Sequence, residues 1–147
     1  MNTNNKIEDI ANFYLTFFPV LKKKILPPIE NAHKKEISPT HFWILLLLEE
    51  CGKLPTTEIG KRLLILKSNL TPLINKLLSK GFVSRENAQH DRRIIYILLT
   101  DEGREYIQQE MNYLHGEIKK RFVDLDDKDI HKLHESIKNM SEVIAKL

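Results

Sequence analysis

Hydrophobic residues between positions 56 and 81 recur at helical spacing in two short runs with a turn between them. The first run predicts a helix from about Thr56 to Leu64. The second predicts a helix that begins near Ser68 or Asn69 and ends at Gly81, which is expected to be a left-handed stop. The inward positions of the first helix are expected to be Ile59, Leu63 and Leu64. The inward positions of the second, which step by three and four residues, are Leu70, Leu73, Ile74, Leu77 and Leu78.

The face of the second helix opposite this apolar stripe is polar. Its side chains are donors and acceptors of the right size to contact base edges and phosphates. They are Lys67, Ser68, Asn69, Thr71, Asn75, Lys76 and Lys80. This face is the candidate DNA-reading surface.

Two further runs, Phe82–Arg85 and Ile94–Thr100, are rich in β-branched and aromatic residues and predict two strands. The segment between them, Asn87–Arg93, is polar and ends in two arginines. Lys53–Leu54 is expected to pair briefly with this hairpin as a third strand. Two short helices followed by a hairpin with a basic tip form a winged helix-turn-helix, a layout that suggests binding to DNA.

A further helix is predicted just before this region. Ser38 is a good N-cap, Pro39 suits the first helical position, and the helix should extend to about Cys51 with Gly52 as its stop. Its run Phe42–Leu48 is apolar on nearly every side. Neighbouring elements should therefore cover this helix from several directions.

Long amphipathic helices are predicted at both ends of the chain. Residues 5–26 form one, which Pro19 should kink. Thr100 should cap a second, which extends to about Phe122, and Asp126 should cap a final helix through about residue 145. The apolar stripe of the first helix is Ile7, Ile10, Tyr14, Phe17, Leu21 and Ile25. That of the second is Ile107, Met111, Leu114, Ile118 and Phe122, and that of the final helix is Ile130, Leu133, Ile137, Met140, Ile144 and Leu147.

Three terminal helices with continuous apolar stripes offer more surface than one small winged helix can cover. We expect them to pack together between two subunits, which makes the chain a homodimer, and a monomeric helical cap is the alternative. The expected fold class is mainly α with a small β-hairpin wing. A winged helix-turn-helix DNA-binding lobe should occupy residues 38–100, and residues 1–37 and 101–147 should build a helical dimerisation lobe.

Composition and charge narrow the class of protein. The longest unbroken apolar run, Phe42–Leu48, is too short to span a membrane. The single cysteine, Cys51, excludes an internal disulfide framework and fits a reducing cytoplasm. The net charge is only +3, but residues 53–93 hold nine Lys or Arg and three Asp or Glu, a net charge of +6. This concentration is expected of a DNA-facing lobe, and a solvated basic face without a ligand is the alternative.

No catalytic or cofactor-binding pattern stands out. The chain has no nucleophile with a recognisable base and no phosphate-binding glycine loop, so we expect neither an enzyme nor a cofactor. His131 and His134 are three residues apart, but a metal site would need further ligands, and we expect surface histidines instead. Cys51 has Glu49 and Glu50 beside it in sequence, whereas a reactive thiolate favours basic surroundings.

The stretch from Lys67 to Arg104 resembles the MarR family of bacterial transcriptional regulators, and the order of elements resembles that family along nearly the whole chain. KSNLT and LINKLLSKGFVSR are similar to the family's recognition helix and the strand after it. DRR and ILLTDEGR are similar to its wing and the start of its next helix. The resemblance implies a homodimer with a winged helix on each subunit and with N- and C-terminal helices at the dimer interface. It also implies that small molecules act from the crevice between the lobes.

Matched residue by residue, the resemblance implies several roles. It places Ser68, Asn69, Thr71, Pro72, Asn75 and Lys76 on the groove-facing helix, where Lys67 also lies by spacing. Arg93 matches the wing-tip arginine, which enters the minor groove, and Arg92 is a candidate phosphate contact. Asp91 matches the acid that braces the wing, with Arg85 as its candidate partner. Leu70–Leu73 is similar to a subgroup that senses organic hydroperoxides, but the N-terminal helix has no cysteine, so that mechanism is not carried over.

Side chains from several predicted helices are candidates for an effector pocket. They are Tyr14, Phe17, His33, His41, Phe42, Trp43 and Met111. Aromatic residues at helical spacing are also typical of a core, and that alternative stays open. We expect a sequence-specific repressor that binds a pseudo-palindromic duplex operator and is released by a small-molecule effector, aromatic or other. The alternatives are a metal- or redox-responsive regulator of the same fold and a winged helix used for protein contacts.

Overall fold

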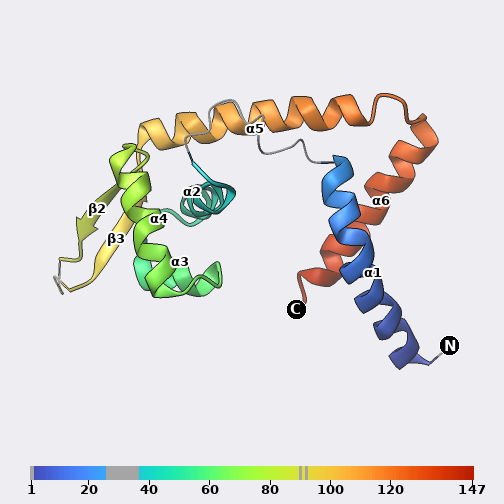
Figure 1. The fold of residues 1–147 in the computed structure, drawn as a ribbon, viewed down its shortest axis with the longest axis horizontal. Coiled ribbons are helices and arrows are strands. Elements are labelled where there is room, and N and C mark those ends of the chain that lie inside the picture. Colours follow the sequence, from blue (N-terminus) through green and yellow to red (C-terminus); the bar gives the residue numbers. More distant parts are fainter. Residues whose placement is uncertain (1, 26–36, 90, 92) are drawn as a thin grey trace. The chain divides into compact units, whose positions relative to one another are not determined.

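The computed structural model describes residues 2–25, 37–89, 91 and 93–147. Within these residues the chain is mostly helical with a small antiparallel sheet of three strands, which confirms the expected fold class (Figure 1). The elements are α1 (Thr3–Ile25), α2 (Pro39–Cys51), β1 (Leu54–Pro55), α3 (Thr56–Arg62), α4 (Lys67–Ser79), β2 (Val83–Asn87), β3 (Ile95–Leu99), α5 (Asp101–Arg121) and α6 (Asp127–Ile144). His33 and Arg92, two of the candidate site residues, lie outside the described residues.

The chain divides into two compact units, and the boundary falls within α5. One unit, Pro28–Tyr113, holds α2, α3, α4, the sheet and the first part of α5, and we call it the winged unit. The other, Met1–Pro27 with Leu114–Leu147, holds α1, α6 and the end of α5, and we call it the helical unit. The start of α5 groups with the winged unit because Ile107 is buried in that unit's core.

The core of the winged unit forms around α2. Ile44, Leu45 and Leu48 are at most 1% exposed and pack with residues from α3, α4 and the sheet. The buried cluster comprises Ile44, Leu45, Leu48, Leu54, Ile59, Leu70, Ile74, Leu77, Phe82, Val83, Ile97, Leu99 and Ile107. Neighbouring elements were expected to cover α2 from several directions, but Trp43 is 58% exposed within the chain.

The sheet has strand order β1-β3-β2, so β3 is central and the expected third strand is present. On β3, Ile97 pairs with Leu54 of β1 on one side and with Arg85 of β2 on the other. Cross-strand partners project from the same face of a sheet. Ile97 is only 1% exposed, so Arg85 starts from the face of the hairpin that is turned toward the core.

Three residues with positive φ stop or redirect the chain. Gly52 after α2 and Gly81 after α4 have φ of 74° and 75°, which confirms both predicted glycine stops. The prediction for α3 was partly wrong: the helix ends at Arg62, and Leu64, expected to point inward, has φ of 55° and is 92% exposed. The left-handed backbone at Leu64 breaks the helical periodicity that assigned its side chain to the core.

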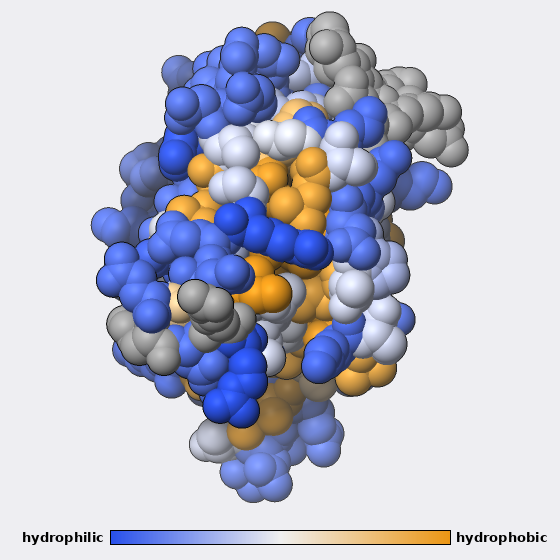
Figure 2. All heavy atoms as spheres, turned by 90° about the vertical axis from the view of Figure 1, so that its left-hand side faces the viewer, coloured by the Kyte–Doolittle hydropathy of each residue, from blue (hydrophilic) through white to orange (hydrophobic). Residues whose placement is uncertain are grey.

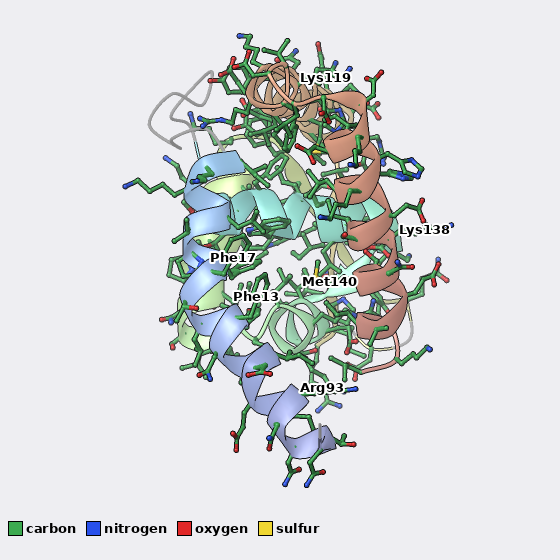
Figure 3. The ribbon with its side chains drawn as sticks, turned by 90° about the vertical axis from the view of Figure 1, so that its right-hand side faces the viewer. Phe13, Phe17, Arg93, Lys119, Lys138 and Met140 are labelled. Carbon is green, nitrogen blue, oxygen red and sulfur yellow. The ribbon has the colours of Figure 1, made fainter. Side chains whose placement is uncertain are left out.

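In the helical unit, no residue of α1 or α6 is buried by the described chain. Arg121 Nη1 donates a hydrogen bond to the carbonyl of Lys24 at 2.9 Å, which joins the end of α5 to the end of α1. Figure 3 shows Phe13 and Phe17 on the flank of α1 that is turned toward α6. These two rings stack at 4.6 Å and are 54% and 43% exposed.

Candidate nucleic-acid interface

Helix α4 presents the polar surface predicted from its spacing. Leu70, Ile74 and Leu77 are buried against the core. The predicted contact positions on this helix and its C-cap are all exposed, and they are Lys67, Ser68, Asn69, Thr71, Pro72, Asn75, Lys76 and Lys80. Thr71 Oγ1 donates to the carbonyl of Lys67 at 3.1 Å, so its oxygen is left to accept from a ligand. One side of α4 therefore offers donors and acceptors to solvent.

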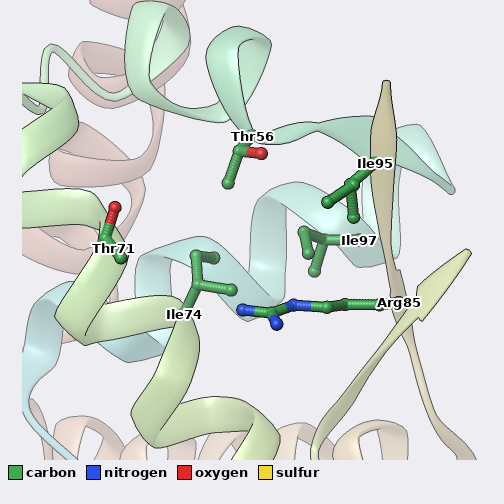
Figure 4. Close-up of a pocket in the computed structure, with 6 residues that line it drawn as sticks. All are labelled: Thr56, Thr71, Ile74, Arg85, Ile95 and Ile97. Carbon is green, nitrogen blue, oxygen red and sulfur yellow. The ribbon is translucent and has the colours of Figure 1, made fainter. Parts of the chain in front are cut away.

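A cleft of about 170 Å³ separates the polar face of α4 from the hairpin. It is lined by Thr56, Thr71, Ile74, Arg85, Ile95 and Ile97 (Figure 4). On this side of the molecule, hydrophilic side chains surround a central group of hydrophobic ones (Figure 2). Figure 4 shows Arg85 extended from β2 across this cleft toward α4.

Arg85 contacts α4 and not the tip of the wing. Its Nη2 donates to Asn75 Oδ1 at 2.8 Å. The sequence had suggested Asp91 as its partner, but in the structure Asp91 accepts from Arg93 instead. The register explains the difference, because Arg85 stands opposite Ile97 in the middle of the hairpin, away from its tip.

The wing tip is held by a local turn at Asp91. The Asp91 carboxylate accepts from the backbone N–H of Arg93 at 2.9 Å and from its Nε at 3.3 Å. The turn also brings Ala88 N within 2.9 Å of the Ile94 carbonyl. Ala88 is 5% exposed, so the tip buries one small side chain. The side chain of Arg93 is 92% exposed and free to meet a ligand.

The opposite face of the hairpin is tied to the start of β1. Lys53 Nζ lies 2.7 Å from Glu86 Oε1 and 5.1 Å from the centre of the Tyr96 ring. Glu86 and Tyr96 are cross-strand partners, so Lys53 reaches across the central strand to hold both. The hydrogen bond to Glu86 raises the pKa of Lys53. This contact was not predicted from the sequence, although alternation along β2 places Arg85 and Glu86 on opposite faces.

His41 is a buried polar group beneath α4. Its Nδ1 accepts from the backbone N–H of Ser38 at 3.1 Å and lies 2.6 Å from Ser38 Oγ, so it caps the start of α2. Its Nε2 has no hydrogen-bond partner among the described residues. Burial lowers the pKa of His41, and the charge of Lys76 on α4 lowers it further. His41 is therefore neutral at neutral pH.

The candidate effector residues are divided between the two units. Tyr14 and Phe17 belong to the helical unit and are exposed, with Tyr14 stacked on Phe18 at 5.2 Å. His41, Trp43 and Met111 belong to the winged unit, where Met111 packs against the core. A pocket formed by these residues stays a prediction.

Cys51 has a basic neighbour that the sequence did not indicate. Arg62 Nη1 lies 3.1 Å from Cys51 Sγ, while Arg62 Nε bonds Glu58 Oε1 at 2.9 Å. The adjacent glutamates in sequence were therefore a poor guide to its surroundings. In the part of the chain that the structure describes, no three His, Cys, Asp or Glu side chains gather as metal ligands would.

Comparisons with known proteins show the family to which this chain belongs. The MarR family model matches residues 37–95. The chain is 35% identical over 104 residues to the HTH-type transcriptional regulator YkoM of Bacillus subtilis. The aligned region covers 71% of this chain and 68% of YkoM. The chain belongs to the MarR family. It is also 33% identical over 84 residues to the HTH-type transcriptional repressor MdtR of B. subtilis. This aligned region covers 56% of this chain and 54% of MdtR.

Solved structures agree with this membership at the level of the fold. YusO from B. subtilis superposes with a TM-score of 0.71 at 20% identity, covering 97% of this chain and 99% of YusO. FabT from Streptococcus pneumoniae, solved in complex with DNA, superposes with a TM-score of 0.62 at 18% identity, covering 97% and 95%. This MarR-family chain is thus a DNA-binding regulator of transcription. Among its described helices, none has both the length and the apolar character needed to cross a lipid bilayer.

Proposed function

We propose that this MarR-family chain is a cytoplasmic repressor that binds a pseudo-palindromic operator as a homodimer and is released by a small-molecule effector. One observation carries the DNA-binding part of the proposal. The exposed polar face of α4 and the exposed Arg93 side chain lie on two elements that the Arg85–Asn75 hydrogen bond connects.

On DNA, the two elements have different tasks. Side chains of α4, among them Asn75 and Thr71, contact base edges in the major groove and supply sequence discrimination. Arg93 enters the adjacent minor groove, where negative potential is enhanced when the groove is narrow. Lys67, Lys76 and Arg92 contact phosphates, which supply affinity without sequence information.

The exposed apolar side chains of the helical unit support the homodimer. None of the residues of α1 or α6 is buried by the described chain, although both helices carry continuous apolar stripes. A contiguous apolar surface of this kind is unstable in water unless something covers it. A second copy offers the same stripes in a self-complementary arrangement, as a two-fold interface requires.

Release by an effector requires two states of the dimer. The effector favours a state in which the two recognition helices are wrongly spaced for the operator, and it acts only through its different affinities for the two states. Candidate contacts are Tyr14, Phe17, His33, His41, Trp43 and Met111. The exposed rings of Tyr14 and Trp43 support a small aromatic or other small-molecule effector. The name of MdtR as a repressor supports repression as the mode of control.

Selection of duplexes from a random pool by the purified protein tests the proposal. We expect enrichment of an inverted repeat whose half-sites are about one helical turn apart. Transcription from a promoter that carries this repeat should fall when the protein is added. If the protein enriches no sequence and retains no duplex at low salt, the winged helix serves protein contacts and the proposal is wrong.

A further inference from the structure

The contact between Arg85 and Asn75 fixes which way the Asn75 amide faces. Asn75 is exposed on the polar side of α4, and its Oδ1 accepts from Arg85 Nη2 at 2.8 Å. A guanidinium group has five N–H donors and no acceptor. Only the oxygen of the amide can therefore face Arg85, which leaves the two N–H donors of Nδ2 to face away from the wing.

Arg85 is well placed to hold this orientation. It stands on β2 opposite Ile97 and lines the cleft with Ile74 and Ile95, so its alkyl chain has apolar neighbours along its course (Figure 4). Among the described residues, no carboxylate lies within ion-pair distance of its guanidinium. The Asn75 oxygen is thus the acceptor for this charge, and hydrogen bonds from a charged donor are stronger than neutral ones.

We propose that Arg85 is a positioning residue that makes Asn75 read operator bases as a donor only. An asparagine that recognises adenine needs both its oxygen, for N6–H, and its nitrogen, for N7. With the oxygen turned to Arg85, Asn75 can only donate, so it favours guanine, which offers two acceptors at O6 and N7, or thymine O4. Adenine offers the single acceptor N7, and its N6–H is left without an acceptor on Asn75, which disfavours it. The inference rests on the proposed function, because it requires α4 to lie in the major groove.

The test compares base preferences between variants. Arg85→Met keeps an unbranched apolar chain in the cleft but removes the donors, so the Asn75 amide becomes free to turn. Arg85→Lys keeps a partner that can only donate. Affinity is measured for the selected operator and for duplexes in which each half-site position carries each of the four bases, and thermal melting checks that every variant folds.

At one half-site position, the wild type should disfavour adenine. Arg85→Met should raise the relative affinity for adenine there by about tenfold, while Arg85→Lys should keep the wild-type preference. Asn75→Ala should remove the preference at this position. Arg85→Met combined with Asn75→Ala should behave like Asn75→Ala alone, because Arg85 acts on the base through Asn75.

Two results would overturn the inference. A uniform loss of affinity in Arg85→Met on all duplexes, unrelated sequences included, would make Arg85 a phosphate contact. An unchanged base preference in a folded Arg85→Met protein would show that the Asn75 amide is not set by Arg85. In both cases the wild type still binds its operator, so these results differ from failure of the proposed function, in which the wild type selects no duplex at all.

Discussion

Gly103, in the first turn of α5, lies against the backbone of the residue that precedes β2. Thr100 connects the two segments, because its Oγ1 donates to the Gly81 carbonyl at 2.6 Å and accepts from the Gly103 N–H at 3.0 Å. A Cβ atom at position 103 would lie 2.1 Å from the Phe82 carbonyl oxygen and 2.9 Å from Leu99 Cδ1. The contact with a backbone atom cannot be relieved by rotating a side chain, so the start of α5 must shift.

Gly103→Ala should therefore lower the free energy of unfolding by about 1–3 kcal/mol, the usual range for overpacking. Gly116→Ala is the matched control in the same helix, since a methyl group at position 116 would meet no described atom within 4 Å. That substitution should leave stability unchanged or raise it by about 0.5–1 kcal/mol. Urea unfolding of the two variants measures the difference, and equal midpoints would contradict the close approach at Phe82.

His41 couples stability to pH. Its pKa in the folded chain is lowered by burial and by Lys76, from an unfolded value of 6.5. Above that pH both states are neutral at His41, and the residue contributes no pH dependence. Below it the unfolded chain takes up a proton that the folded chain does not, so the free energy of unfolding falls as the pH drops.

His41→Gln removes this titration and keeps an acceptor for the Ser38 N–H. The wild type should lose more stability between about pH 7.5 and pH 5.5 than this variant does, because only the wild type must keep His41 uncharged. Urea unfolding across the pH range measures the two slopes. Parallel curves would mean that His41 is protonated in the folded chain as easily as in the unfolded one.

At the scale of elements, the proposed DNA contact of the wing can be tested separately from the turn that holds its tip. Asp91 holds the tip through the backbone N–H of residue 93, which any residue at that position except proline supplies. Its second contact, with Arg93 Nε, is an exposed ion pair, and such pairs add little stability. Arg93→Ala should keep the melting temperature within about 2 °C and weaken operator binding by about 1–3 kcal/mol. Asp91→Ala should weaken binding too, because the tip loses its turn. Undiminished affinity in a stably folded Arg93→Ala protein would refute the wing contact.

Elements set by local signals were predictable from sequence, and contacts set by register were not. Ser38, Gly52 and Gly81 mark helix ends through their own chemistry, and the buried positions of α4 follow its spacing. The prediction that Leu64 points inward was wrong, because the pattern of hydrophobic residues does not reveal that its backbone is left-handed. The resemblance suggested Arg85 as the partner of Asp91, and only the pairing of β2 with β3 shows that Arg85 faces α4.

At the scale of the molecule, the exposed stripes of α1 and α6 predict an obligate homodimer. Figure 3 shows Met140 on the flank of α6 turned toward α1 and Lys138 on the opposite flank. Met140 is 51% exposed within the chain. Met140→Glu should place a charge in the interface and dissociate the dimer, whereas Lys138→Glu, two residues away, should leave it intact.

Sedimentation at micromolar concentration distinguishes these states. The wild type and Lys138→Glu should sediment as dimers, and Met140→Glu should shift toward the monomer with reduced thermal stability. A wild-type monomer at this concentration, or a Met140→Glu dimer as stable as the wild type, would show that something other than a second copy covers these helices.

The most direct test of the central claim is the salt dependence of operator affinity. Residues 53–93 carry a net charge of +6, and Lys67, Lys76 and Arg92 are the proposed phosphate contacts. Each neutralised phosphate releases counterions, so the logarithm of the association constant should fall linearly with the logarithm of salt concentration. For a dimer that makes about 6–10 phosphate contacts, affinity should fall by about 10³- to 10⁵-fold between about 50 and 200 mM salt. An affinity that stays constant over this range would contradict the account.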